Sequence, residues 1–323
     1  MRYPFLQIGG LFAVILLVAL PARAELSVVA SIPPVHSLVA KVMAGAGEPH
    51  LLLRNGQSPH EYALRPSDAR AIENADLIIL VSPTIETFLG AAVERNADHD
   101  GRVVELSEAK GVTHLSVREG TLWDSPEHDE HTEHGHDEHD DKSAEEQAAH
   151  DHGPDDPHVW LSPSNAQAFV TAIAASLAAR DPDRAALYHA NAVAAVQDLE
   201  ELSQTIRQKL APVKDRPFLV FHDAYQYFEA AFDLTAAGAI SLGTGAPPGA
   251  ARLRALRQRV ADGDIRCIFR EVQFRPRLAE VVAEGSGAKL GTLDPVGSTI
   301  PFGPDAYNAL MLGLADGFES CLR

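Results

Sequence analysis

Cysteine, basic residues and long apolar runs are all scarce in this sequence. Of its 323 residues only 2 are Cys, and 27 Lys and Arg stand against 45 Asp and Glu, which gives a formal net charge of −18 at pH 7. A chain this acidic disfavours nucleic acid and anionic membrane surfaces as partners, because both carry the same sign of charge. The same balance favours cations as ligands.

The longest apolar run disfavours a membrane span and, with its flanking residues, indicates an exported protein. It extends only from Leu11 to Leu20, whereas a transmembrane helix needs about 20 apolar residues. A basic residue precedes the run and a small-x-small sequence ending at Ala24 follows it, which is the pattern of a cleavable secretory signal peptide. We predict a signal peptide over residues 1–24, with a retained anchor as the disfavoured alternative. Cleavage would remove two Arg and no acid, which changes the net charge from −18 to −20.

The two cysteines, Cys267 and Cys321, lie far from the histidine clusters of the chain. In an exported protein such a pair favours a disulfide. Closing a loop of about 55 residues would remove about 4 kcal/mol of unfolded-chain entropy. Two buried thiols or a metal-binding pair are the alternatives.

Two enzyme signatures are also missing. The sequence has no H-E-x-x-H motif and no G-x-S-x-G motif, and its isolated histidines are scattered over both halves. A secreted zinc hydrolase would need an open coordination position and a general base. We therefore disfavour a hydrolase and predict that the protein is not an enzyme.

Histidine beside carboxylate is abundant in one stretch. Between Asp124 and Asp156 there are fourteen Asp or Glu and one Lys, with no apolar periodicity from which a core could form. Imidazole next to carboxylate suits a borderline cation such as zinc, whereas a solvated acidic spacer has no use for imidazole. We predict a disordered, metal-collecting loop at about residues 124–157, the acidic-histidine loop. Its collecting residues are His128, His131, His134, His136, His139, His150 and His152.

The rest of the chain predicts two α/β lobes. Short continuous apolar strands alternate with amphipathic helices on both sides of the acidic-histidine loop, which is typical of mostly parallel sheets flanked by helices. From Asp183 to Leu210 a helical pattern runs without Gly or Pro, which predicts one long rigid helix joining the halves. The expected domains are an N-terminal lobe at 25–180, a linker helix at 181–211 and a C-terminal lobe at 212–323.

Four candidate metal ligands share one property, which is a position at or soon after the end of a predicted element. They are His60, His158, His222 and Asp294. Ligands of open parallel sheets collect beyond the carboxyl ends of the strands, so we predict that these residues meet in the cleft between the lobes. Three neutral imidazoles and one carboxylate would complete a tetrahedral shell for zinc.

Five segments carry a family resemblance. They are Ser58-Pro-His60-Glu-Tyr-Ala-Leu-Arg-Pro-Ser-Asp68, Asp156-Pro-His158-Val-Trp-Leu-Ser-Pro163, Phe221-His222-Asp-Ala-Tyr225, Gln273-Phe-Arg-Pro276 and Gly291-Thr-Leu-Asp294-Pro. These segments resemble the signatures of the zinc-uptake solute-binding proteins, the ZnuA-type (cluster A-I) periplasmic components of metal ABC transporters. The resemblance extends from about Leu26 to the C-terminus.

This resemblance implies two α/β lobes, a rigid connecting helix and a metal bound between the lobes. It also implies delivery to an inner-membrane permease driven by an ATPase, with zinc chaperones as further candidate partners and a monomeric state. The family's three metal histidines fall on His60, His158 and His222. The pair Cys267 and Cys321 resembles the family's second-lobe disulfide.

The sequence departs from the family pattern at one position and favours zinc at another. Some zinc members have Glu directly before the first ligand histidine, whereas Pro59 stands here and Glu61 follows the histidine. Manganese-type relatives carry a carboxylate at the position of His222, so the third imidazole favours zinc over manganese. Asp294, Glu61 and water remain the options for the fourth ligand.

These observations predict a periplasmic high-affinity protein that captures Zn²⁺ and delivers it to an ABC-type permease. The alternatives are a manganese or general divalent-metal binding protein or metal buffer of the same family, and a secreted zinc hydrolase. Trp160 and Tyr225 are expected to pack against the ligands, and Asp223 to orient an imidazole.

Overall fold

The computed structural model describes residues 25–54, 56–96, 101–118, 122–123, 155–241, 249–262 and 265–323. Two predictions fall outside these residues. One is the signal peptide, and the other is the set of collecting residues in the acidic-histidine loop, which are His128, His131, His134, His136, His139, His150 and His152. Both stay predictions.

A four-stranded parallel sheet forms the N-terminal half, here called the N-lobe, with strand order β2-β1-β3-β4. Its strands are β1 Val28–Ala30, β2 His50–Leu51, β3 Leu77–Leu80 and β4 Val103–Glu105, and its helices are α1 Pro33–Val42, α2 Pro66–Asn74 and α3 Gly90–Asn96. Successive residues of β3 pack into different hydrophobic clusters, one on each face of the sheet. The apolar run therefore shows no alternation, as expected for a strand buried on both faces.

A second four-stranded parallel sheet forms the C-terminal half, the C-lobe, with strand order β6-β5-β7-β8. Its strands are β5 Phe218–His222, β6 Ala236–Ser241, β7 Cys267–Glu271 and β8 Lys289–Leu293, and its helices are α6 Gln226–Phe232, α7 Ala250–Ala261 and α8 Arg277–Ala283. A disulfide joins Cys267 of β7 to Cys321, which confirms that prediction. The predicted class of two α/β lobes with parallel sheets is confirmed as well.

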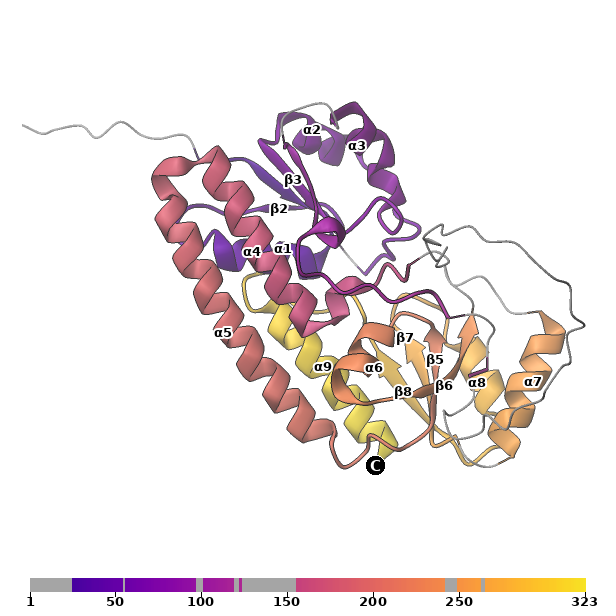
Figure 1. The fold of residues 1–323 in the computed structure, drawn as a ribbon. Helices are drawn as coiled ribbons and strands as arrows, with labels where there is room; N and C mark the ends of the chain where they lie inside the picture. The colour runs from indigo at the N-terminus through magenta and orange to yellow at the C-terminus, as the bar shows by residue number, and fades with distance from the viewer. Residues whose placement is uncertain are drawn as a thin grey trace, which may run out of the picture.

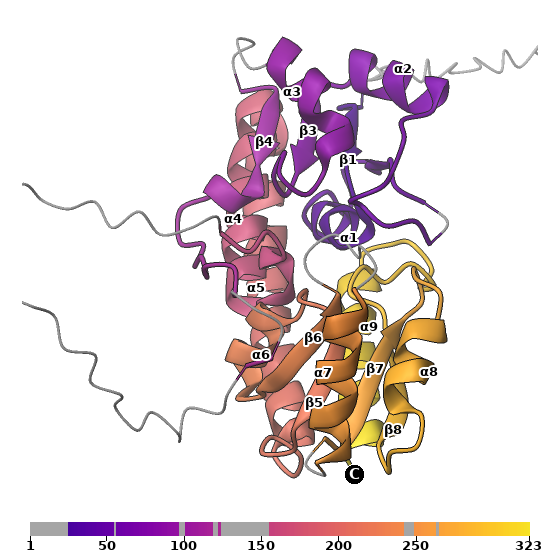
Figure 2. The same ribbon diagram turned by 90° about the vertical axis from the view of Figure 1, so that its right-hand side faces the viewer.

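Three long helices form a base under both lobes: α4 Pro163–Arg180, α5 Ala185–Leu210 and α9 Ala306–Leu322. The 26 residues of α5 give a rod of about 39 Å, and this helix packs against α1 and α4 of the N-lobe and against α9 of the C-lobe. Figure 1 shows α5 running along the side of both halves. In the turned view of Figure 2 the two sheets lie one above the other. The predicted long helix is thus present and links the lobes.

Candidate metal centre

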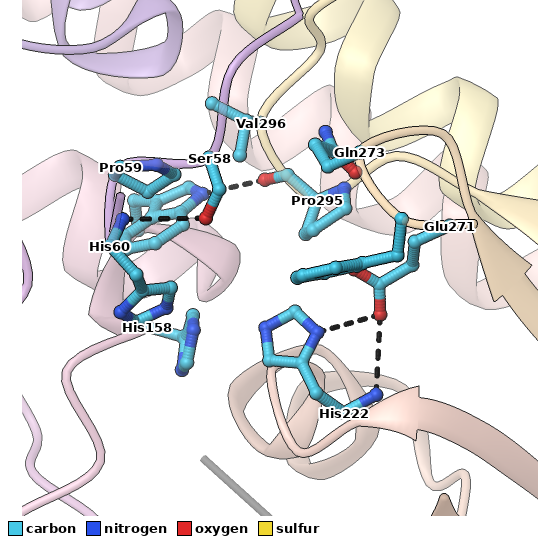
Figure 3. A pocket seen from close by; sticks show the side chains of 11 residues that line it. Ser58, Pro59, His60, His158, His222, Glu271, Gln273, Pro295 and Val296 are labelled. Atoms are coloured by element: carbon cyan, nitrogen blue, oxygen red, sulfur yellow. Dashed lines mark hydrogen bonds and ion pairs between the residues drawn. The ribbon is translucent and has the colours of Figure 1, made fainter. Parts of the chain in front are cut away.

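The structure brings His60, His158 and His222 together. One nitrogen of each ring lies within 4.8 Å of the other two, and the ring centroids are 5.5, 6.0 and 5.3 Å apart. Figure 3 shows the three rings approaching one another from separate parts of the chain. Two nitrogens bound at the tetrahedral angle to one zinc ion are about 3.4 Å apart. The rings therefore need to close by up to about 1.5 Å to share an ion.

His60 comes from the turn between β2 and α2. Its backbone N–H donates to Ser58 Oγ at 3.3 Å. Asp68 of α2 holds the far side of the turn, because its carboxylate accepts the Tyr62 hydroxyl at 2.6 Å and the Arg65 backbone N–H at 3.0 Å. The side chain is half-buried, and among the described residues no carboxylate hydrogen-bonds to its ring.

His158 lies just after the end of the acidic-histidine loop and is 5% exposed. Its Nδ1–H donates to Asp156 Oδ1 at 2.7 Å, and the same oxygen accepts its backbone N–H at 3.0 Å. A carboxylate only accepts, so Nδ1 carries the proton and Nε2 offers its lone pair to a metal. The next turn is fixed to the C-lobe, since Trp160 Nε1–H donates to the Pro295 carbonyl and the Tyr307 hydroxyl donates to the Trp160 carbonyl, each at 2.8 Å.

His222 is the last residue of β5 and is 3% exposed. Its Nδ1–H donates to Oε1 of Glu271 at 2.7 Å. Glu271 ends the neighbouring parallel strand β7, so the two side chains leave the sheet at the same edge. As with His158, the carboxylate fixes the tautomer and leaves Nε2 for a metal.

His60 and His222 differ in their affinity for protons. Burial, together with the nearby His158 and His222, lowers the pKa of His60 to about 3. Burial also lowers the pKa of His222, but the Glu271 carboxylate outweighs burial and the pKa is raised above 6.5. His60 is therefore neutral and ready to bind at any ordinary pH, whereas protons compete for His222.

A small cavity lies between the rings. Its lining residues are Ser58, Pro59, His60, His158, Trp160, His222, Glu271, Gln273, Phe274, Pro295 and Val296. The volume is about 10 Å³, close to the smallest space that holds one water molecule. Within the described part of the chain, the buried Nε2 atoms of His60 and His158 have no hydrogen-bond partner. A single bound cation would satisfy these lone pairs, and a larger ligand would not fit between them.

Asp294 is not brought into this group. Its Oδ1 accepts from Gln273 Nε2 at 2.7 Å and from the Gly297 backbone N–H at 3.0 Å, and its Oδ2 accepts from Ser298 Oγ at 2.9 Å. Over the described residues, the group of close ligand atoms contains the three histidines. Asp294 thus folds the turn that starts with Pro295, a residue of the cavity wall.

Trp160 and Tyr225 pack against the ligands as expected, whereas Asp223 does not have the expected role. The rings of Trp160 and Tyr225 lie 5.3 Å from His158 and 6.4 Å from His222, respectively. Asp223 does not orient an imidazole, because its carboxylate is engaged by Arg118. Sequence reasoning missed Glu271, which orients the His222 ring, although an acidic residue at the end of a strand beside β5 was a signal for it.

The described helices include none that is long and apolar enough to cross a membrane.

Two parallel-sheet lobes on a common helical base, with three imidazoles converging between them, define the class of two-lobed solute-binding proteins with a metal as the solute. Residues 28–321 match the family described as zinc-uptake complex component A, periplasmic, and the chain belongs to this family.

Two relatives by sequence carry the same name. The high-affinity zinc uptake system protein ZnuA of Brucella abortus (strain 2308) is 41% identical over 305 residues, 91% of either chain. The protein of the same name from Paracoccus denitrificans (strain Pd 1222) is 39% identical over 313 residues, 94% of either chain. In both cases the similarity covers almost the whole length of the two proteins.

Solved structures share the fold at lower identity. A crystal structure of ZnuA superposes with a TM-score of 0.73 at 24% identity, covering 93% of this chain and 100% of that one. A structure of the solute-binding protein FpvC of Pseudomonas aeruginosa in complex with Ni²⁺ has a TM-score of 0.71 at 21% identity, covering 93% of this chain and 96% of that one. A complex of FpvC with Mn²⁺ gives a TM-score of 0.70 at 21% identity, covering 93% and 98%. The fold is therefore shared by proteins that bind different transition metals.

Proposed function

We propose that this chain is a periplasmic high-affinity binding protein that captures Zn²⁺ and delivers it to the permease of an ABC transporter. The observation that carries the proposal is the convergence of three buried or half-buried imidazoles from distant parts of the chain on one ion-sized cavity. The family and the names of the relatives point the same way.

Zinc is the ion that this donor set suits best. Nitrogen donors favour zinc, whereas oxygen donors favour manganese. The carboxylates behind His158 and His222 fix the orientation of those rings, which strengthens binding to a borderline cation. A manganese or general divalent-metal protein or buffer is the second candidate, because the FpvC structures hold Ni²⁺ and Mn²⁺ on the same fold.

The fourth coordination position is taken by water in this proposal. Asp294 already uses both carboxylate oxygens within its own turn, and Glu61 is exposed. A metal-bound water does not make the protein a hydrolase, because the cavity has no room for a substrate beside the ion and Glu271 is committed to His222. We therefore infer a transport protein without catalysis.

The remaining parts of the proposal concern partners and location. The signal peptide of residues 1–24 would direct the chain to the periplasm, where a monomer meets an inner-membrane permease driven by an ATPase. Zinc chaperones are further candidate partners, and neither nucleic acid nor membrane insertion is involved. The acidic-histidine loop would raise the local zinc concentration through weak, exchangeable sites.

Release requires that at least one imidazole leave the ion. His60 is the ligand best suited to leave, because it is half-buried and is the only one of the three without a carboxylate on its ring among the described residues. His222 belongs to the C-lobe, and the turn that follows His158 is hydrogen-bonded to it, so these two ligands would stay in place.

Competition titration of the mature protein with zinc and a chelator tests the proposal. The variants His60→Ala and His222→Ala should lose the tight site, whereas deletion of residues 129–152 should remove weak sites and spare the tight one. His189→Ala, which changes an exposed histidine of α5, is the control and should bind as the parent does. Loss of the tight site in the loop deletion, or tighter binding of manganese than zinc, would refute the proposal.

A further inference from the structure

A buried guanidinium lies beside the metal centre and has no part in the proposal so far. The side chain of Arg118 is 19% exposed. Its Nε–H donates to Asp223 Oδ2 at 3.0 Å, its Nη1–H donates to Glu229 Oε2 at 2.9 Å, and Nη2 bonds to both carboxylates. The two acidic side chains are 12% and 4% exposed, and the ring of Trp123 covers the guanidinium at 3.8 Å.

Arg118 ends a segment that crosses between the lobes. We call residues 112–118 the crossing segment. At its start, the Thr113 backbone N–H donates to Asn165 Oδ1 at 2.8 Å, and Asn165 Nδ2 donates back to the Thr113 carbonyl at 3.0 Å. Near its end, Gln226 Nε2 of α6 donates to the Ser116 carbonyl at 3.3 Å. The segment is therefore tied to α4 at one end and to the C-lobe at the other.

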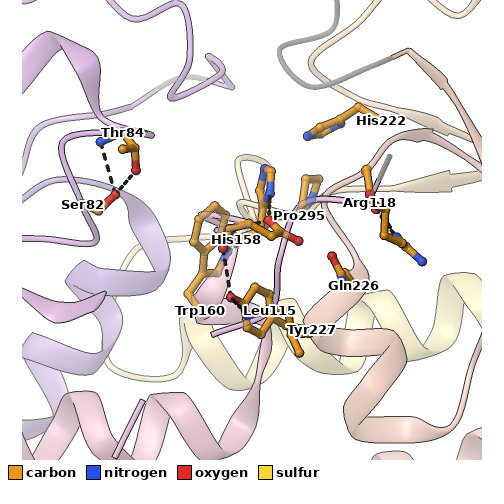
Figure 4. Close-up of polar contacts among 12 residues, drawn as sticks. Ser82, Thr84, Leu115, Arg118, His158, Trp160, His222, Gln226, Tyr227 and Pro295 are labelled. Atoms are coloured by element: carbon orange, nitrogen blue, oxygen red, sulfur yellow. Dashed lines mark hydrogen bonds and ion pairs between the residues drawn. The ribbon is translucent and has the colours of Figure 1, made fainter. Parts of the chain in front are cut away.

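The middle of the crossing segment holds Asp156 in place, and Asp156 orients the ring of His158. The Leu115 carbonyl accepts the Asp156 backbone N–H at 2.8 Å. The Tyr227 hydroxyl accepts the Leu115 backbone N–H and donates to the Asp156 carbonyl, each at 2.9 Å. Asp156 in turn fixes the ring of His158. Figure 4 shows Leu115, Tyr227 and Arg118 on the C-lobe side of the site, across from Ser82 and Thr84 of the N-lobe.

We propose that Arg118 is a positioning residue for metal retention. Asp223 directly follows His222, so the contact between Arg118 and Asp223 joins the crossing segment, which supports His158, to the strand end that carries His222. The two carboxylate-backed ligands are thereby held as one unit. The inference rests on the proposed function, because it assigns Arg118 to the retention of the same ion.

The forked guanidinium suits this task and an ammonium does not. Arg118 engages two carboxylates with three different nitrogens, a planar arrangement that Lys lacks. Arg118→Lys keeps the charge and removes the fork, so it is the informative variant. Arg118→Ala leaves two buried carboxylates without their cation and is expected to damage folding. A neutral variant that combines Arg118→Met with Asp223→Asn and Glu229→Gln avoids that damage.

The experiment loads the mature full chain with zinc, adds excess chelator and follows the slow phase of release from the tight site. Urea unfolding of the metal-free protein is measured in parallel. Arg118→Lys and the neutral variant are expected to release zinc about tenfold faster, in the range seen for outer-shell changes. The control Arg184→Lys changes an arginine that pairs with Asp181 at the start of α5, remote from the cavity, and should release zinc at the parental rate.

Two results would overturn the inference in different ways. If Arg118→Lys loses stability but releases zinc at the parental rate, the arginine has a structural role alone. If the parent itself shows no slow phase and no tight zinc, the proposed function fails, and this inference falls with it.

Discussion

The carboxylate behind His222 sets the acid limit of the site at the scale of single residues. Glu271 raises the pKa of His222 above its ordinary value of 6.5 against the effect of burial, whereas the pKa of His60 is lowered to about 3, chiefly by burial. A metal binds the neutral ring. As the pH falls, protons therefore compete with the metal for His222 at a higher pH than for His60, and zinc affinity begins to fall near the raised pKa of His222.

The variant Glu271→Gln tests this assignment. Without the carboxylate, His222 loses the largest contribution that raises its pKa while the effect of burial remains, so the pKa falls and the pH at which zinc affinity begins to drop should move downward. At pH 8 the affinity itself should be about 10-fold weaker, because the amide oxygen still accepts from the ring but no longer supplies the negative charge behind it. Chelator competition at a series of pH values from 5 to 8 measures both effects. An unchanged midpoint would mean that Glu271 does not control the protonation of His222.

Asp294 gives a second test at this scale. If Asp294 only accepts hydrogen bonds within its own turn, the variant Asp294→Asn should still bind one zinc ion tightly. The amide oxygen of Asn can still accept the Gly297 N–H. Asp294→Ala should lower the free energy of unfolding by about 1–3 kcal/mol, because buried donors lose their partner. Zinc titration and urea unfolding of both variants separate the two roles. A loss of zinc affinity in Asp294→Asn as large as that in His60→Ala would make Asp294 a ligand instead.

At the scale of elements, close packing of α9 on β8 holds the strand that leads into the Asp294 turn. A Cβ added at Gly317 would lie 2.8 Å from Leu293 Cδ2 and 3.1 Å from the Thr292 carbonyl, whereas one added at Gly313 would meet nothing within 4 Å. Both glycines lie within α9. The contact therefore explains why residue 317 is Gly. Gly313 makes no such contact and only lowers the stability of the helix.

The matched pair Gly317→Ala and Gly313→Ala measures this contact. Gly313→Ala should stabilise the metal-free protein by up to about 1 kcal/mol, the helix propensity difference. Gly317→Ala should destabilise it by about 1–3 kcal/mol through overpacking. Urea unfolding of the two variants gives the values. Equal stabilisation by both would show that α9 does not press on β8 as described.

Most elements were predictable from the sequence because their apolar runs are strong. The sequence predicts strands over residues 77–81, 218–221 and 267–272, and these lie at β3, β5 and β7. It predicts no strand at β6, because Ala-Ala-Gly-Ala has little β propensity and the strand forms through pairing with β5. It also predicts a helix over residues 84–97, which begins instead as a 3-10 turn at Thr87–Leu89 before α3.

At the scale of the whole molecule, one hydrophobic core spans the two lobes. The same cluster includes Leu38 of α1, Leu199 of α5 and Phe318 of α9, and these three helices contact one another. A continuous packed core resists shear. We therefore expect zinc to change the loops at the cavity and to leave the helical base as it is.

Hydrogen exchange with and without zinc tests this rigidity. Zinc should add protection at the turn that carries His60 and around His158. Amides of α1, α5 and α9 should be equally protected in both states, because their opening needs the shared core to break. A zinc-dependent change of protection along α5 would indicate instead that the lobes move as hinged bodies.

The convergence of the ligands was predictable only in part. The rule that ligands collect beyond the carboxyl ends of parallel strands correctly identified the edge of each sheet at which the site lies. The family resemblance identified the three histidines that converge there, His60, His158 and His222. Strand position alone could not separate His222 from Asp294, since His222 ends β5 and Asp294 directly follows β8 of the same sheet. The difference arises from hydrogen bonds between Asp294 and a turn that closes only in the folded chain.

The most direct test of the central claim is anomalous diffraction at the zinc absorption edge from crystals of the zinc-loaded protein. The account predicts one strong peak in the cavity, about 2.0–2.1 Å from a ring nitrogen of His60, of His158 and of His222. A peak bound by fewer than these three imidazoles, or a tight zinc located elsewhere in the chain, would contradict it.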